Sequence, residues 1–579
     1  MLNLVYDWWL ASSACIAFHL PSARYVHHQY YHPAPKLNME LPPCESFVAM
    51  VLLVMVTLLL RRVVRPGHGY RLPPGPKPWP IIGNLHLIDA LPHRSIHELS
   101  KRHGPLMQLR FGSFPVVVGS SSEMARFFLK THDALFADRP RSAAGRYTTY
   151  DYSDMLWSPY GAHWRRLRKV CLTELFSAAR LDSYEHIRLE EVRTLLRDLH
   201  RATTTTTGSG RRATVVIKEY LFTATLGMIS RMVLGKKYVE NAEGTPSSEA
   251  AAAMTPQEFT RIMDEFFLLN GVLNVGDFIP WLEWLDLQGY VGRMNKISRT
   301  LDAFMERVLD EHNERRRMEG ESFAARDMVD VLLQLADDPT NVDGQLERQT
   351  IKALTQDLIA GGTNTSGVTL EWAISELMRN PRTLAAATEE LDRVIGHDRL
   401  VTERDMASLP YTRAVVKETL RMHPVGPLLA PHKAREDASV DGYDIPAGTR
   451  VLVNVWAIGR DPALWDAPEE FRPERFMPRA GTGSKVVDVV GQDMELLPFG
   501  AGRRMCPGYN LGLKVVQVCL ANLLHGFVWR LPDGMAAEQL SMDEVFGLTT
   551  SRKFPLEAVL EPKLPAHLYT LHADMVLDG

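Results

Sequence analysis

Residues 499–508, FGAGRRMCPG, place a cysteine on a glycine-rich segment directly ahead of a helical pattern that runs over residues 509–524. The glycines at 500, 502 and 508 permit backbone conformations and close approaches that other residues do not. A cysteine near a helix amino terminus faces the positive end of the helix dipole, which favours its thiolate. Isolated cysteines are more often inert core residues, as we expect of Cys171 and Cys519. In this setting Cys506 is instead a candidate metal ligand.

The whole chain has the composition of a globular protein, with 579 residues, 45% hydrophobic and 23% charged. The net charge of −4 gives no reason to expect nucleic acid as a partner. Five scattered cysteines without a CxxC pair exclude a disulfide framework and a cysteine-rich zinc site. Helical patterns dominate, and short β-like runs at 115–119 and 449–455 interrupt them. These patterns predict a mainly α fold with small β-sheets (α+β) in one large domain over residues 81–579.

The amino-terminal part carries an apolar run at 47–60, FVAMVLLVMVTLLL, with glutamates before it and arginines after it. This asymmetry predicts a single-pass membrane anchor over residues 39–65, with everything downstream in the cytosol. A cleaved signal peptide is the alternative, but the basic region and the small-residue cleavage site are missing. Residues 1–38 share no pattern with the rest and are expected to be an upstream extension, disordered or not translated. The prolines of residues 66–80 predict a stiff hinge.

The cysteine stretch matches the pattern FxxGxRxCxG, and the chain thereby resembles the cytochrome P-450 family of haem-thiolate monooxygenases. The resemblance implies the cytochrome P-450 fold and a haem b cofactor whose iron is bound by the Cys506 sulfur. Phe499 would shield that sulfur, and Arg504 would pair with a haem propionate. The cofactor contacts implied within this stretch are Phe499, Gly502, Arg504, Cys506 and Gly508.

A second family motif is the ExxR pair Glu418 and Arg421, which share one helix face. Such pairs are usually solvated surface contacts. Here, however, the motif resembles that of the family, and residues 473–476, PERF, would supply Arg475 as a third member. The resemblance implies a buried structural cluster of ion pairs that holds the haem-binding loop and is costly to break.

A third motif, AGGTNTS at 360–366, lies inside a helical run over residues 346–380. Glycines in a helix interior are destabilising, so Gly361 and its neighbour indicate a local opening of the backbone, with a small-residue packing seam as the alternative. The resemblance makes this the helix that crosses the haem face. Thr365 would there hydrogen-bond dioxygen and steer protons to it. Asn364 stands where the family usually has an acid, and an amide positions water without exchanging protons as a carboxylate does.

Trp164 and Arg168 lie one helical turn apart, and similar residues in the family donate to haem propionates. His432 is a further candidate for a propionate contact by resemblance. Nearby cations predict a basic docking surface for an acidic reductase, with an ordinary solvated face as the alternative. The cations concerned are Arg165, Arg166, Lys169, Arg503 and Lys514.

The resemblance covers residues 70–560 and is most detailed to plant microsomal (A-type) members such as flavonoid 3'-monooxygenases. It implies electrons from NADPH through NADPH–cytochrome P-450 reductase, with cytochrome b5 as a second donor, at the endoplasmic reticulum membrane. One oxygen atom would enter a small hydrophobic substrate, foremost a flavonoid or another phenolic of plant secondary metabolism. A terpenoid oxidase, a reductase-independent isomerase or dehydratase, and a haem-binding protein without turnover remain alternatives. Substrate contacts are expected from residues 142–157, 425–430 and 548–550, and from Ala360 and Thr365.

Overall fold

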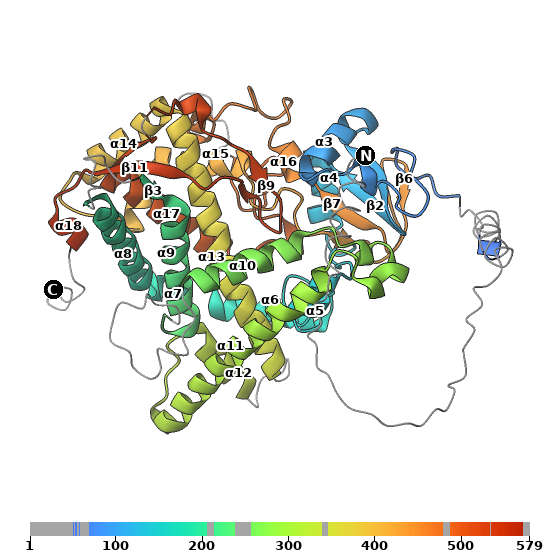
Figure 1. Ribbon diagram of the computed structural model, residues 1–579, viewed down its shortest axis with the longest axis horizontal. Helices are drawn as coiled ribbons and strands as arrows, with labels where there is room; N and C mark the ends of the chain where they lie inside the picture. The colour runs from blue at the N-terminus through green and yellow to red at the C-terminus, as the bar shows by residue number, and fades with distance from the viewer. Residues whose placement is uncertain are drawn as a thin grey trace, which may run out of the picture. The chain divides into compact units, whose positions relative to one another are not determined.

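A computed structural model describes residues 69–204, 214–237, 256–337, 346–478, 487–532 and 534–570, together with residues 50, 53, 54 and 57. The predicted upstream extension (1–38) and nearly all of the predicted anchor (39–65) lie outside the described residues. Within the described part, every helix is too short or too polar to span a membrane. The chain divides into two compact units, residues 1–69 and 70–579, and the elements labelled in Figure 1 belong to the second.

The second unit is mainly helical (Figure 1), as the periodicity of the sequence predicts. Its longer helices are α3 (Pro92–His103), α8 (Glu185–Thr204), α9 (Ile217–Leu234), α10 (Pro256–Gly271), α11 (Tyr290–Glu319), α12 (Met328–Asp337), α13 (Arg348–Arg379), α14 (Pro381–Ile395), α15 (Pro410–Met422) and α17 (Tyr509–Gly526). Its shorter helices are α4 (Ser122–Arg126), α5 (Ala143–Thr148), α6 (Ala162–Val170), α7 (Ala178–Ser183), α16 (Val455–Ile458) and α18 (His567–Thr570).

Small sheets complete the unit and confirm the expectation of a mainly α fold. The four-stranded sheet has the order β1 (Leu106–Phe111), β2 (Phe114–Gly119), β7 (Arg450–Val453) and β4 (His432–Lys433). A three-stranded sheet joins β3 (Thr214–Val216), β11 (Glu557–Pro562) and β8 (Phe527–Arg530). Two-stranded sheets pair β5 (Ala438–Val440) with β6 (Tyr443–Ile445) and β9 (Glu544–Val545) with β10 (Ser551–Arg552). The predicted runs at 115–119 and 449–455 correspond to β2 and β7.

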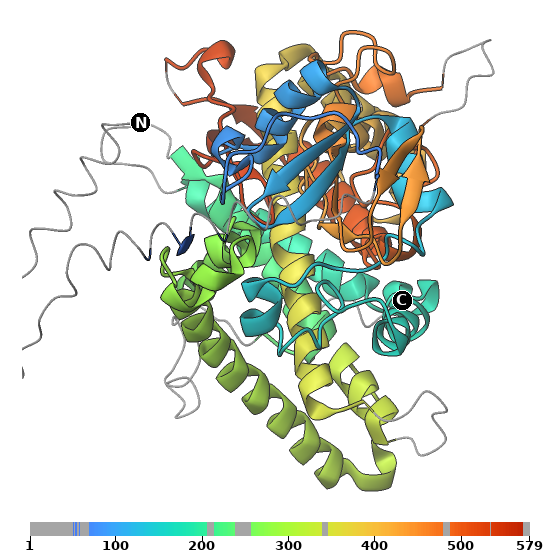
Figure 2. The same ribbon diagram turned by 90° about the vertical axis from the view of Figure 1, so that its right-hand side faces the viewer.

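Helix α13 runs through the middle of the helical part, where it packs against α9, α11, α14, α15 and α17 (Figures 1 and 2). Because neighbours surround it, side chains are buried around its circumference rather than along one stripe, with Trp372 among the most deeply buried. The backbone opening predicted at Gly361 is absent, since residues 348–379 form one continuous α-helix. The helix therefore provides a rigid wall for whatever lies beside it.

The proline-rich segment lies against the four-stranded sheet. The Gln108 N–H of β1 donates to the Pro74 carbonyl at 2.8 Å, and Arg71 exchanges two hydrogen bonds with Asp444 of β6 at 2.7 and 2.8 Å. Of the predicted hinge (66–80), the described residues from 71 onward are thus tied to the same unit as the sheet.

Candidate active site

A cavity of about 380 Å³ lies between α13 and the loop that leads into α17. It brings together most of the residues that the sequence predicts to hold a cofactor or to act in catalysis: Trp164, Arg168, Gly361, Thr365, His432, Phe499, Arg504, Cys506 and Gly508. Gly502 and Asn364 are the two exceptions. The segments predicted to contact substrate also line the cavity, through Thr149, residues 154–157, Val425, Gly426, Leu429, Ala430, Leu548 and Thr549.

The loop at 499–508 turns back on itself, and the Cys506 N–H donates to the Phe499 carbonyl at 2.9 Å. Gly500 and Gly502 have φ of +69° and +64°, a region that favours glycine. A Cβ on Gly502 would also lie 1.9 Å from the Leu129 carbonyl oxygen. Gly508 differs, because its φ is −89° and an added Cβ would make only ordinary contact with Phe176 at 3.6 Å. Gly502 therefore shapes the loop from outside the cavity.

Cys506 presents its side chain to the cavity, and burial raises the pKa of its thiol above the ordinary value. A hydrogen bond from the Gly508 N–H and the charge of Arg168 lower it, but burial outweighs them. The amide at the helix terminus thus favours the thiolate, as expected, but it does not outweigh burial in the chain by itself. A bound metal ion would supply the missing positive charge, because coordination removes the proton of a thiol outright.

Three guanidinium groups, those of Arg139, Arg168 and Arg504, line the same cavity. Their hydrogen bonds go to backbone carbonyls, among them Leu156 for Arg139 at 3.0 Å and Ala137 for Arg504 at 2.7 Å. Within the described part of the chain, none of the three forms an ion pair with a carboxylate. Burial lowers the pKa of Arg504 to about 10 and that of Arg139 well below its usual range. One buried and two half-buried cations, none of them paired with an anion in the described part of the chain, fit a ligand that brings carboxylates.

Trp164 and His432 also line the cavity. In each of them one ring nitrogen already bonds a backbone carbonyl. The Trp164 Nε1–H donates to the Met155 carbonyl at 3.2 Å. His432 Nδ1 lies 2.9 Å from the Phe136 carbonyl, which assigns the proton to Nδ1. Burial, together with the charges of Arg139 and Arg504, lowers the pKa of His432 to about 3. His432 is thus neutral in the chain by itself.

On the opposite wall, Gly361 and Thr365 face the cavity one helical turn apart, and the Thr365 hydroxyl donates to the Gly361 carbonyl at 2.6 Å. Asn364 is buried and lies outside the cavity lining, which corrects its predicted place in the site. Its Oδ1 accepts a hydrogen bond of 3.0 Å from the Thr549 hydroxyl, and Thr549 does line the cavity. Asn364 therefore reaches the cavity only through Thr549.

Several lining residues are absent from the sequence-based predictions. Helices α9 and α10 contribute aliphatic and aromatic side chains that no motif marks. Two carboxyl groups, Asp154 and Asp357, also line the cavity. The spacing of Asp357, Gly361 and Thr365, four residues apart in turn, is the one sequence signal that places Asp357 on the same helix face. The missed residues include Ile229, Val233, Phe266, Phe267, Asn270 and Asp357, whereas Asp154 belongs to the predicted segment 142–157.

The ExxR pair lies in the core, on α15. Arg421 donates to both carboxylate oxygens of Glu418, at 2.7 and 2.8 Å, and neither side chain is exposed. The Arg475 Nε donates to Glu418 at 3.2 Å, and its other nitrogens bond the carbonyls of Asp466 and Ala467. The structure thus brings Glu418, Arg421 and Arg475 together as a buried network that joins α15 to the segment carrying PERF.

The cations of the predicted docking surface are partly engaged by acidic side chains. Lys514 pairs with Glu403 at 2.9 Å and with Asp182 at 3.3 Å. Arg503 pairs with Asp133 at 3.2 Å. These contacts reduce the net positive charge of the surface that the sequence predicts.

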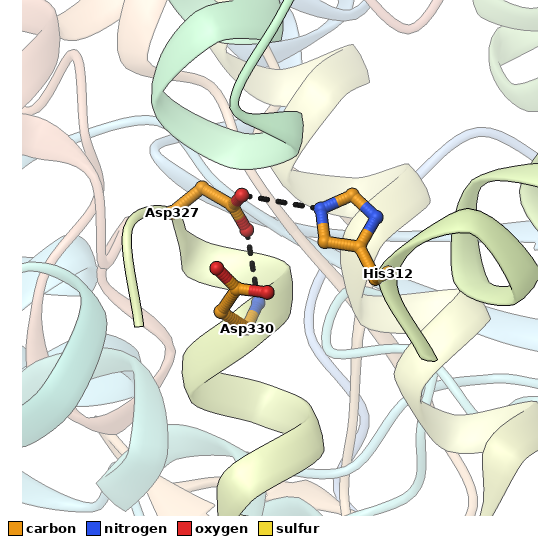
Figure 3. Close-up of side chains that lie close together, drawn as sticks. All are labelled: His312, Asp327 and Asp330. Carbon is orange, nitrogen blue, oxygen red and sulfur yellow. Dashed lines mark hydrogen bonds and ion pairs between the residues drawn. The ribbon is translucent and has the colours of Figure 1, made fainter. Parts of the chain in front are cut away.

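A separate cluster of His312, Asp327 and Asp330 has the residue types of a metal site (Figure 3). Asp327 accepts from His312 Nε2 at 3.1 Å and from the Asp330 N–H at 2.9 Å, so it caps α12. Burial alone would lower the pKa of His312, but the hydrogen bond and charge of Asp327 raise it. Arg315 pairs with both aspartates. Because the side chains of His312 and Arg315 supply positive charge, the cluster is best explained as a structural link between α11 and α12.

Comparison with known proteins identifies the family. The family model described as Cytochrome P450 matches residues 73–555. The fold is similar to that of a zebra fish cytochrome P450 solved with abiraterone, with a TM-score of 0.66 and 24% identity over 82% of this chain and 100% of that one.

Plant relatives resemble the chain more closely. A trimethyltridecatetraene synthase of Zea mays is 53% identical, over 90% of this chain and 95% of its own. A dimethylnonatriene synthase of Zea mays is 50% identical, over 92% and 99%. A flavonoid 3'-monooxygenase of Petunia hybrida is 44% identical, over 89% and 97%. Because the family model and these relatives cover most of the chain, it belongs to the cytochrome P450 family of monooxygenases, which implies a haem cofactor.

Proposed function

We propose that this protein is a haem-thiolate monooxygenase that oxidises an apolar terpenoid. The proposed chemistry rests on one observation, that Cys506 and Thr365 lie on opposite walls of the same cavity. The substrate class rests on the two Zea mays relatives, each named for a methylated polyene hydrocarbon. These relatives favour the terpenoid alternative over the flavonoid that the sequence analysis placed first.

The residues of the cavity fit haem b. The Cys506 sulfur would bind the iron, and Phe499, beside Tyr509 with ring centroids 6.3 Å apart, would cover that sulfur. Arg139, Arg168 and Arg504 would receive the propionates, whose charges their present partners do not supply. Trp164, over which the Arg504 guanidinium lies at 4.4 Å, would hold this cation in place. A propionate beside His432 would raise the pKa of its imidazole. When bound, haem supplies the activation of dioxygen.

The chain's own residues would then manage protons and water. The Thr365 hydroxyl is both a donor and an acceptor, so it can hold a proton at the cavity and pass it on. Asn364 cannot exchange a proton, but it fixes the Thr549 hydroxyl at 3.0 Å. Proton delivery would thus pass through the hydroxyls of Thr365 and Thr549 in place of a carboxylate at position 364. The closely packed α13 keeps bulk water out.

The lining near Thr365 suits an apolar molecule. Ile229, Val233, Leu354, Leu358, Phe266 and Phe267 line the cavity beside Ala360. Aliphatic and aromatic linings with few polar groups are typical of sites for hydrophobic ligands. A polyene chain fits this aliphatic and aromatic part of the lining, because such a chain brings no polar group that would need a partner there.

Electrons would come from NADPH through NADPH–cytochrome P-450 reductase, with cytochrome b5 as a second donor. The exposed faces of Arg503 and Lys514 support a contact with an acidic partner, although each also pairs within the chain. The endoplasmic reticulum membrane would hold the protein through residues 39–65, with residues 81–579 as the catalytic domain in the cytosol and 66–80 as the hinge.

The experiment that tests this proposal combines microsomes carrying the protein with plant reductase, NADPH and two substrate panels. One panel holds acyclic terpenoids and the other flavonoids, and products are identified by mass spectrometry. Oxidation of terpenoids at a higher kcat/KM than any flavonoid is the expected result. Preferred addition of a hydroxyl group to a flavonoid ring would instead support the relatives at 44% identity, and product without NADPH would contradict monooxygenation.

A further inference from the structure

Two carboxyl groups, those of Asp154 and Asp357, line the cavity, and neither forms an ion pair with the arginines that would receive the propionates. Asp154 is completely buried, and its Oδ2 accepts from the Trp157 N–H at 3.0 Å. Its Oδ1 is also buried but accepts no hydrogen bond. Asp357 lies on the α13 face that carries Gly361 and Thr365, and its Oδ2 accepts from the Met155 N–H at 2.7 Å. Buried polar atoms nearly always have partners, and although the Thr149 hydroxyl and the Leu156 N–H act on this carboxyl group, neither makes an aligned hydrogen bond to Oδ1, which can accept one from a ligand.

The surroundings of the pair favour a single shared proton. Burial raises the pKa of Asp154 to about 6, and burial together with the charge of Asp154 raises the pKa of Asp357 well above its ordinary value. No described cation forms an ion pair with either carboxyl group. Arg139 and Arg504 act on Asp154 through space, while the Cys171 thiol is the neighbour of Asp357. Each of the two carboxyl groups disfavours ionisation of the other, so a state in which the pair retains one proton is favoured over one in which both ionise.

The loop that delivers Asp154 has a strained backbone. Tyr150, Asp151 and Tyr152 have φ of 53°, 52° and 63°, three left-handed residues in succession without a glycine. Each such residue costs on the order of 1 kcal/mol or more, and strain of this kind gathers at functional sites. The Tyr152 hydroxyl, which donates to the Ser142 carbonyl at 2.8 Å, and Gln349, which donates to the Tyr150 carbonyl at 2.9 Å, hold the turn in place. This strain is explained if the turn must adopt that conformation to bring Asp154 to the cavity.

We propose that Asp154 and Asp357 form a hydrogen-bonding subsite for one neutral hydroxyl group of an otherwise apolar substrate. The inference rests on the proposed function and deepens it. A carboxyl pair with one proton offers a donor and an acceptor, which is the combination that a hydroxyl group needs. Arg139 and Arg504 disfavour a cationic amine there, and the charge of the pair disfavours a carboxylate.

This subsite would also select the reacting part of the substrate. Asp357 and Thr365 are eight residues apart on one helix, roughly 12 Å along its axis. A hydroxyl group bound at Asp357 fixes which carbon atoms of a long chain lie beside Thr365. Asp154 and Asp357 are therefore positioning residues, and they do not touch the reacting atoms.

The test measures equilibrium binding to the haem-loaded enzyme by the substrate-induced absorbance shift, using matched compounds with and without a hydroxyl group. The probes are farnesol against farnesene, and naphthol against naphthalene. Asp357→Leu and Asp154→Ala remove the subsite in two independent ways. Asp357→Asn keeps a donor and an acceptor as well as the contact to Met155. Asp151→Asn makes the same change on an exposed side chain of the same loop.

The wild type should bind each hydroxyl compound about tenfold more tightly than its hydrocarbon. Asp357→Leu and Asp154→Ala should bring the ratio close to one, whereas Asp357→Asn and Asp151→Asn should keep it. If Asp357→Leu fails to retain haem, the binding ratio measured with Asp154→Ala decides whether the subsite exists. Equal binding by the wild type, or a preference that survives in the variants lacking the subsite, overturns the inference. A hydroxyl preference seen only with naphthol would leave the subsite standing and reject the terpenoid class.

The shared proton has its own signature. Infrared spectroscopy of the wild type and of Asp151→Asn should show the carbonyl stretch of a buried protonated carboxyl group, shifted in heavy water. Asp357→Asn should lose this contribution, because the amide takes the place of the protonated acid, whereas other buried carboxyl groups with raised pKa, such as Asp277 and Glu371, contribute equally to both spectra. A difference spectrum of wild type minus Asp357→Asn that lacks the band contradicts a proton held by the pair.

Discussion

The two walls of the cavity differ in how far their function constrains the backbone. The loop at 499–508 needs two glycines with positive φ and a backbone contact with Leu129 that leaves no room for a Cβ. The wall made by α13 is continuous α-helix without residues at positive φ, and its close approach at Gly362 is to the side chain of Ile229, at 2.2 Å from an added Cβ, and not to a backbone carbonyl. Changes in the loop or its support should therefore cost stability and haem retention. Changes on α13 should leave the fold intact and alter turnover.

The largest effect is expected in the buried cluster on α15, at Arg421. Arg421→Ala leaves the Glu418 carboxylate buried with one fewer partner, and breaking such a pair costs about 3 to 5 kcal/mol. Denaturant unfolding of the haem-loaded protein measures this loss. Arg472→Ala is the matched control, since that side chain is partly exposed and its pair with Asp466 is worth about 1 kcal/mol or less. Equal losses of unfolding free energy in both variants would mean that the buried cluster stabilises the protein no more than an exposed ion pair does.

A smaller loss of stability is expected within the loop. Gly502→Ala forces a non-glycine residue to a φ of +64° and places its Cβ against the Leu129 carbonyl. We expect a cost of about 2 to 3 kcal/mol and reduced haem content. Gly508→Ala should lose far less, because its φ is −89° and the nearest atom is 3.6 Å away. Thermal unfolding and haem content per chain are measured for both variants. A larger loss in Gly508→Ala than in Gly502→Ala would refute the backbone constraint at Gly502.

On the α13 wall, Thr365→Ala should act on turnover alone. Loss of the hydroxyl removes a group that holds a proton at the cavity, so product formed per NADPH should fall by about tenfold or more. Thr365→Ser retains the hydroxyl and should stay near the wild type. Product and NADPH consumption are measured together, with haem content as the check on the fold. A drop in haem content equal to that of Gly502→Ala would erase the difference between the walls.

The smallest effect is expected at Asn364. Asn364→Asp keeps the acceptor for the Thr549 hydroxyl and adds a group that exchanges protons, so the yield per NADPH should rise by about twofold while the haem spectrum stays unchanged. Asn270→Asp makes the same change elsewhere in the cavity lining and should bring no gain. An unchanged yield in Asn364→Asp would exclude a proton-delivery role for this position.

The difference between the walls also explains what the sequence predicts. Where backbone geometry demands particular residues, as at 499–508, the motif is dense and the cavity residues follow from it. The helix at 346–380 follows from its periodicity, and the meeting of Glu418, Arg421 and Arg475 is predicted by the family resemblance and not by a local pattern. Contacts between distant segments determine which way the Asn364 side chain points. They also determine that Asp154 reaches the cavity. The raised pKa of Cys506 depends on burial, which no local pattern reports.

The most direct test of the account is the absorbance of the reduced protein under carbon monoxide. The wild type should show the red-shifted band of a thiolate-bound haem, and Cys506→Ala should lose it while Cys171→Ala keeps it. A wild type without this band, or a band that survives in Cys506→Ala, would contradict the assignment of Cys506 as the haem ligand.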